Sequence, residues 1–99
     1  MPDLASATAD DFDPAKGEAF DARPLEGDEP FTLVLAEIQR RAGAPGFREP
    51  FSLQFLGPRS PVLPQGTYRL THPKVGALDL FLVPIGASDA GVTYEVVFG

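Results

Sequence analysis

The side chains that could do chemistry are few in this chain. His72 is the only histidine, and there is no cysteine. A cysteine nucleophile is therefore absent, and a zinc site, which needs several His or Cys ligands, is not available. No serine lies in the Gly-x-Ser-x-Gly motif of a nucleophile elbow. We interpret His72, which precedes Pro73 at the end of a predicted strand, as a turn residue bonded to backbone or water.

The carboxylates do not form a recognisable metal-binding or acid–base pattern. Asp11 and Asp13 have the Asp-x-Asp start of a calcium loop, but Lys16 occupies the position that requires glycine. A hydrolase that uses two carboxylates remains an alternative, although most acids fall in the first thirty residues, where a fixed geometry is not expected. Asp79 lies among apolar residues, so we expect a backbone amide or an arginine to satisfy it. The sequence thus predicts no catalytic residue, no metal and no cofactor.

The segment 57–66, GPRSPVLPQG, is the best candidate for a binding element. Its three prolines stiffen it, so it would lose little entropy when a partner binds. Arg59 offers a fixed charge, while Val62 and Leu63 offer apolar tips, and these three are the candidate partner- or ligand-contact residues. The alternative is a stiff connection in which Val62 and Leu63 cap the core.

The elements that would position these residues are mostly strands. Apolar residues alternate in four segments, 50–57, 66–73, 77–85 and 92–99, separated by turns that contain Gly or Pro. Because side chains alternate across a strand, this period indicates β-structure. Short connections make successive strands antiparallel neighbours. Pro84 lacks a backbone N–H and should lie at a strand end, an edge or a bulge.

The first half of the chain is less clear. Residues 31–41 suit a strand or a helix, and we favour a strand because they begin Phe-Thr-Leu-Val and an isolated helix of this length would be marginal. A short strand is predicted near 18–23. Thr8 and Asp11 match a capping pattern, which favours a single helical turn over 9–12.

Together these segments predict a mainly β protein. We expect a small antiparallel meander of five to six strands that forms a barrel or a compact sandwich, with a short N-terminal helical turn. Residues 1–7 are predicted to be a flexible tail and residues 8–99 a single β domain, which suits a chain of 99 residues.

The strand at 77–85 is apolar on both faces. Three leucines alternate with Phe81 and Val83, and such a strand should be covered on both sides. We expect Phe12 and Phe20 to cover the face that bears Phe81, with a second subunit as the alternative cover.

The charge of the chain limits its partners. The net charge is −6; residues 1–30 hold nine acids and two bases, and residues 31–99 hold five acids and six bases. Nucleic-acid binding draws on Lys and Arg to neutralise phosphates, so this balance argues against a nucleic-acid partner. No apolar run is long enough to span a membrane and no signal peptide is evident. We expect a cytoplasmic protein with no membrane partner, while a protein partner or a homo-oligomer remains open, as does a small ligand.

The patterns QGTYRLTHP, LFLVPIG and YEVVF in the second half carry a resemblance. With them the chain resembles, over residues 12–99, a family of short single-domain bacterial proteins of unknown function. Members are often described beside phage-tail-collar-like proteins. The resemblance therefore implies a structural or accessory role in a tail-like assembly, and it implies no catalytic residues.

The function that these observations favour is a non-enzymatic structural or protein-interaction module. The first alternative is a small barrel that binds a ligand or a glycan, which aromatic residues facing a cavity would support. The second alternative is the carboxylate hydrolase described above.

Overall fold

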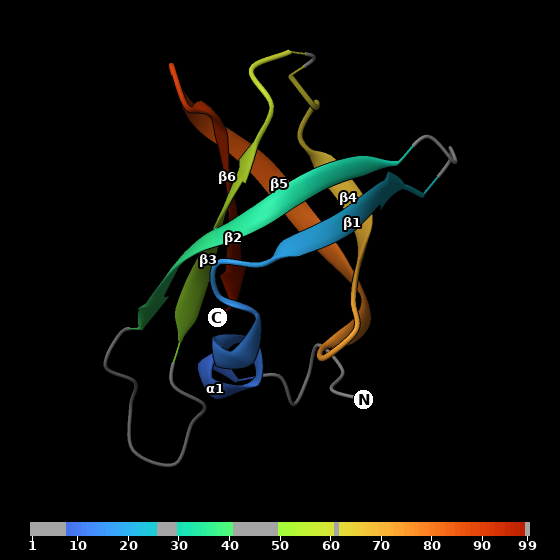
Figure 1. Cartoon of the computed structure of the whole chain (residues 1–99), viewed down its shortest axis with the longest axis vertical. Helices are drawn as coiled ribbons and strands as arrows, with labels where there is room; N and C mark the ends of the chain where they lie inside the picture. Colours follow the sequence, from blue (N-terminus) through green and yellow to red (C-terminus); the bar gives the residue numbers. More distant parts are fainter. Residues whose placement is uncertain (1–7, 26–29, 41–49, 61, 99) are drawn as a thin grey trace.

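The computed structural model describes residues 8–25, 30–40, 50–60 and 62–98. A one-turn helix and a 3-10 turn precede six strands that close into an antiparallel barrel (Figure 1). The predicted flexible tail at 1–7 lies outside the described residues. The elements are α1 (Ala9–Phe12), η1 (Asp13–Ala15), β1 (Ala19–Pro24), β2 (Phe31–Arg40), β3 (Phe51–Gly57), β4 (Gly66–His72), β5 (Gly76–Ser88) and β6 (Gly91–Phe98).

The predicted fold class is confirmed: the protein is mainly β, and the barrel, rather than the sandwich, is the form it takes. The segment that suited strand or helix is strand β2, as we favoured. The predicted helical turn is α1, where the Thr8 N–H donates a 2.9 Å hydrogen bond to Asp11 Oδ2. Local propensity and alternation therefore identified α1 and the six strands, but not the 3-10 turn η1.

The order of the strands departs from an uninterrupted meander at one point. Successive strands pair within β1-β2-β3 and within β4-β5-β6, but the barrel order is β1-β2-β3-β6-β5-β4. The connection at 58–65 leaves β3 and enters β4 on the far side of β5 and β6. The barrel closes because β1 then pairs with β4 and β3 with β6, both antiparallel.

The two three-stranded units share one plan. In each unit the middle strand is the longest and carries a register shift, between Leu35 and Glu37 in β2 and between Pro84 and Gly86 in β5. Before its register shift, β2 pairs with β1, and β5 pairs with β4. After the shift, β2 pairs with β3, and β5 pairs with β6. The units are thus related by an approximate two-fold arrangement, and Pro84 lies at a bulge as expected.

Side chains fill both ends of the barrel. At one end, α1 inserts Phe12, whose ring centroid lies 6.0 Å from that of Phe51 and 5.7 Å from that of Phe98. At the other end, Leu63 is buried, and its N–H donates a 2.8 Å hydrogen bond to Tyr94 Oη. Figure 1 shows α1 at one end and the 58–65 connection at the opposite end.

The predicted cover for Phe81 is wrong. Phe12 is fully buried in the core, and Phe20 packs against Phe55 and His72 with centroid distances of 5.2 and 4.8 Å. Phe81 lies on the outside of the barrel and is 51% exposed. The reason is geometric, because a strand of a small barrel directs only one face to the interior, and no described segment covers the other face.

Candidate functional site

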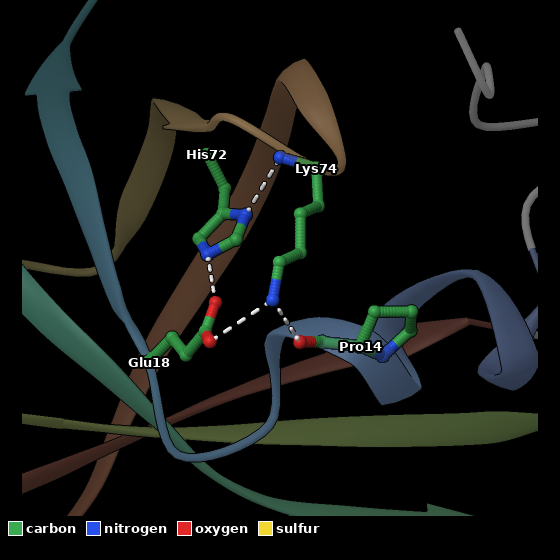
Figure 2. Close-up of polar contacts among 4 residues, drawn as sticks. All are labelled: Pro14, Glu18, His72 and Lys74. Atoms are coloured by element: carbon green, nitrogen blue, oxygen red, sulfur yellow. Dashed lines mark hydrogen bonds and ion pairs between the residues drawn. The ribbon is translucent and has the colours of Figure 1, made fainter.

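The histidine lies in a small polar cluster at the end of β4 (Figure 2). His72 is 4% exposed, and its Nδ1 accepts a hydrogen bond from the Lys74 backbone N–H at 3.0 Å. Its Nε2 lies 2.8 Å from Glu18 Oε1. Because Nδ1 is an acceptor here, we assign the proton of the neutral ring to Nε2, which then donates to Glu18.

Glu18 is the centre of this cluster. The Lys74 ammonium lies 3.1 Å from Glu18 Oε2 and donates a second bond of 3.3 Å to the carbonyl oxygen of Pro14 (Figure 2). The hydrogen bond from Lys74, followed by that from His72, lowers the pKa of the Glu18 carboxyl, and partial desolvation opposes this. The cluster joins the segment before β1 to the turn between β4 and β5.

This arrangement joins two segments that are distant in the sequence and occupies the polar atoms of His72. Both ring nitrogens of His72 have partners within the protein, so neither nitrogen is available to activate a nucleophile. In residues 8–25, 30–40, 50–60 and 62–98, no group of three or more His, Cys, Asp or Glu side chains could hold a metal ion. The backbone bond expected for His72 is present. The Glu18 contact was missed because it depends on the pairing of β1 with β4.

The three candidate contact residues of the 57–66 segment do not form one surface. Leu63 is buried at the end of the barrel, which agrees with the core-capping alternative, whereas Val62 is exposed. Arg59 is exposed and lines a hollow of about 310 Å³ with Ala87, Ser88 and Asp89. The tyrosines Tyr94 and Tyr68 fix this segment through bonds to Leu63 N–H and, at 2.6 Å, to the Pro64 carbonyl.

The outer face of β5 and β6 carries the most unusual surface of the described chain. Phe81 and Ile85 on β5 are 51% and 49% exposed, and Val97 on β6 is 67% exposed. Val83 on β5 pairs directly with Glu95 on β6, and Phe81 and Val97 each lie two residues farther along on the same side. We call Phe81, Val83, Ile85 and Val97 the outer apolar face. Sequence reasoning identified this face as apolar but took it to be covered.

A charged pair borders the outer apolar face on β4 and β5. Arg69 and Asp79 are direct cross-strand partners, and two hydrogen bonds of 2.9 and 3.3 Å join them. The guanidinium lowers the pKa of the Asp79 carboxyl and the carboxylate raises the pKa of Arg69. Of the two partners expected for Asp79, a backbone amide or an arginine, the structure shows the arginine.

The comparisons with known proteins give a family without a function. The chain belongs to the family described as a domain of unknown function (DUF6916), whose model matches residues 7–98. No curated protein and no solved structure matches the chain. Among the described residues, none of the helical segments has the length and apolarity needed to cross a membrane.

Proposed function

From membership of a family with no assigned activity, and from the surface of the barrel, we propose that this protein is a non-enzymatic protein-interaction module. It docks on a partner through the outer apolar face of β5 and β6. The single observation that carries the proposal is the exposure of Phe81, Ile85 and Val97 on two adjacent strands.

The energetics of that surface favour a role in binding. Fully burying a Phe, Val or Ile side chain stabilises a protein by about 1.5–3 kcal/mol relative to leaving it exposed. Single exposed apolar residues are ordinary, but neighbouring ones that form a patch mark an interaction site. Phe81 and Ile85 share one face of β5, and Val97 lies on the strand beside it. A partner that covers this face would bury these apolar side chains and so gain the free energy of burial that the isolated barrel does not gain.

The interior of the barrel and the polar cluster support the same proposal by elimination. A ligand in the lumen would compete with Phe12 at one end and Leu63 at the other, and both are packed into the core. A hydrolase built on the polar cluster or on Asp79 would need an available acid and base there. Glu18 and Asp79 are instead bonded to Lys74 and Arg69, and the nitrogens of His72 are occupied.

The resemblance to proteins described beside phage-tail collars supports a tail-like assembly as the setting. A small barrel with closed ends and an outer apolar face suits an accessory that binds to a larger structural protein. In that case the partner captured at the outer apolar face is a component of such an assembly.

Site-specific photo-cross-linking tests the proposal. A photoreactive p-benzoylphenylalanine is placed at position 81 and, as a matched control, at Thr32, an exposed position on β2 across the barrel. Irradiation of the native cells should give a discrete higher-mass adduct for position 81 and none for position 32. Adducts at neither position, or at both equally, would contradict docking through this face.

A further inference from the structure

Glu95 lies at the centre of the outer face where β3, β6 and β5 run side by side. Its direct neighbours across the sheet are Gln54 on β3 and Val83 on β5. Along β6, Thr93 and Val97 lie on the same outward side. The Glu95 carboxylate is therefore partly exposed among four neutral side chains, of which Val83 and Val97 are apolar.

The apolar neighbours of Glu95 lie at distances suited to enclosing one long side chain. Directly opposed residues on antiparallel strands have Cβ atoms roughly 4.5–5.5 Å apart, and diagonal neighbours are roughly 7–8 Å apart. Val83 is directly opposite Glu95 and Phe81 is diagonal to it. An extended side chain from a partner could thus contact Phe81 and Val97 while its end reaches the carboxylate.

Glu95 differs from Asp79, the acid on the next strand pair, in having no ion-pair partner among the described residues. Asp79 on β5 faces Arg69 across the sheet, and the two form a bidentate pair. Within the described ranges, no ion pair engages Glu95. The same ranges show Arg23, Arg40, Arg69 and Lys74 each bonded to other acids.

We infer that Glu95 and the outer apolar face bind an arginine or lysine side chain of a protein partner. This inference rests on the proposed function and names the chemistry of the partner. The stem of such a side chain packs on Val83 and Val97, its cationic head meets Glu95, and the ring face of Phe81 adds a cation–π contact. Arginine suits the site best, because its planar guanidinium pairs with a carboxylate and stacks on an aromatic ring at once.

Charge also argues against a second copy of this chain as the partner. Glu37 on β2 pairs with Gln54, which in turn pairs with Glu95, so two acids lie in one row across the outer face. Two copies meeting here would bring like charges together, and each chain carries a net charge of −6. An arginine or lysine side chain that meets Glu95 faces no such repulsion.

A peptide titration followed by amide NMR shifts tests the inference. The probes are the acetylated, amidated peptides Ala-Leu-Arg-Leu-Ala and Ala-Leu-Gln-Leu-Ala, added to the whole chain at low salt. The arginine peptide should shift the amides of Val83, Glu95 and Val97 and bind more tightly than the glutamine peptide. Glu95→Gln should weaken the arginine peptide roughly two- to fivefold, as for a partly exposed ion pair, and remove its advantage.

The control variant is Glu37→Gln, which removes an acid from the same row two strands away and should leave both titrations unchanged. Equal shifts from both peptides at this face would overturn the inference while leaving apolar docking in place. Shifts from neither peptide, or an arginine advantage that survives Glu95→Gln, would also overturn it. Loss of the cross-link at position 81 is the separate result that contradicts the proposed function.

Discussion

At the scale of single residues, Glu18 is expected to make the folded protein less stable as the pH falls into the acid range. Its pKa is lowered in the folded protein, chiefly by the hydrogen bond from Lys74. A carboxyl whose folded pKa is lower than its unfolded pKa stabilises the fold fully above the unfolded value, and this contribution is lost as the pH falls through the folded value. The contribution of Glu18 is therefore complete above its ordinary value of 4.5 and disappears at lower pH.

We predict that Glu18→Gln lowers the melting temperature at pH 7 and makes it fall less steeply as the sample is acidified below 4.5. Thermal melts at a series of pH values measure both effects. The matched control is Glu37→Gln, since the described residues supply no ion pair to Glu37. A melting curve for Glu18→Gln that keeps the acid dependence of the wild type would show that the cluster does not couple to folding.

A second residue-scale prediction concerns His72. Replacing it with Gln removes a buried ring that packs on Phe20 and leaves the Lys74 N–H without its acceptor. The loss of a buried hydrogen-bond partner costs about 1–3 kcal/mol. Denaturant titration should show this destabilisation, while the cross-link at Phe81 persists under conditions where the variant is folded. If the cross-link vanished from a folded His72→Gln variant, His72 would belong to the binding function.

At the scale of elements, the hairpin of β5 and β6 depends on Gly91. Its φ of +140° lies in a region that residues with a side chain rarely adopt, and a Cβ there would lie 2.0 Å from the carbonyl oxygen of Gly57. Gly91→Ala should therefore destabilise the barrel by about 2–5 kcal/mol, since backbone strain and a steric clash act together.

Gly86 in the bulge of β5 provides the matched control, because a Cβ there meets nothing within 4 Å. Gly86→Ala should change the free energy of unfolding by no more than about 0.5 kcal/mol. Urea titration of the two variants measures the contrast. Equal effects would mean that the close approach of Gly91 to Gly57 does not constrain the hairpin.

The elements were largely predictable from sequence, and their arrangement was not. Period-two alternation located β3 to β6, and the β-favouring start of residues 31–41 was enough to choose strand for β2. The pairing of β3 with β6 could not be derived, because it depends on where the 58–65 connection crosses. The two-fold plan was also invisible, since the two units share alternation and a bulge but no residue pattern at a fixed spacing.

The contacts of the candidate site were predictable only where they did not depend on the order of the strands. For Asp79 the sequence left a backbone amide or an arginine open as the partner, and the pairing of β4 with β5 supplies Arg69. Glu18 and His72 are brought together only by the β1–β4 pair that closes the barrel. Phe81 was recognised as part of a second apolar face of its strand. Whether that face is covered depends on how many layers of structure the fold has, and the alternation of apolar residues along a strand does not show this.

At the scale of the whole molecule, the barrel separates an interior cluster from the outer apolar face. Phe12 belongs to the interior and has no exposure, whereas Phe81 is half exposed on the outside. Phe12→Ala should cost about 3–5 kcal/mol, as expected for a core phenylalanine. Phe81→Ala should cost far less, because it removes little buried area.

The two changes should also be independent. In a double-mutant cycle, Phe12→Ala and Phe81→Ala should add to within about 0.5 kcal/mol, whereas Phe12→Ala and Phe98→Ala, whose rings are in contact, should couple beyond that value. Chemical denaturation of the three single variants, the two double variants and the wild type provides the data. Strong coupling between positions 12 and 81 would instead support the hypothesis that Phe12 covers Phe81 within the same chain.

The way the barrel closes has a consequence for how the chain is made. The residues that enclose Phe12 are Phe51 and Phe98, and Phe98 ends the last strand, so the earliest helix cannot reach its final packing until β6 has been synthesised. β3 likewise cannot complete its pairing until β6 is present, and β1 cannot complete its pairing until β4 is present. β1 and β3 therefore keep an open edge until β4 and β6 have been synthesised, and folding is governed by contacts distant in sequence. In that interval the unpaired edges of β1 and β3 are exposed to misassembly, and a chaperone that covered them would protect the folding chain.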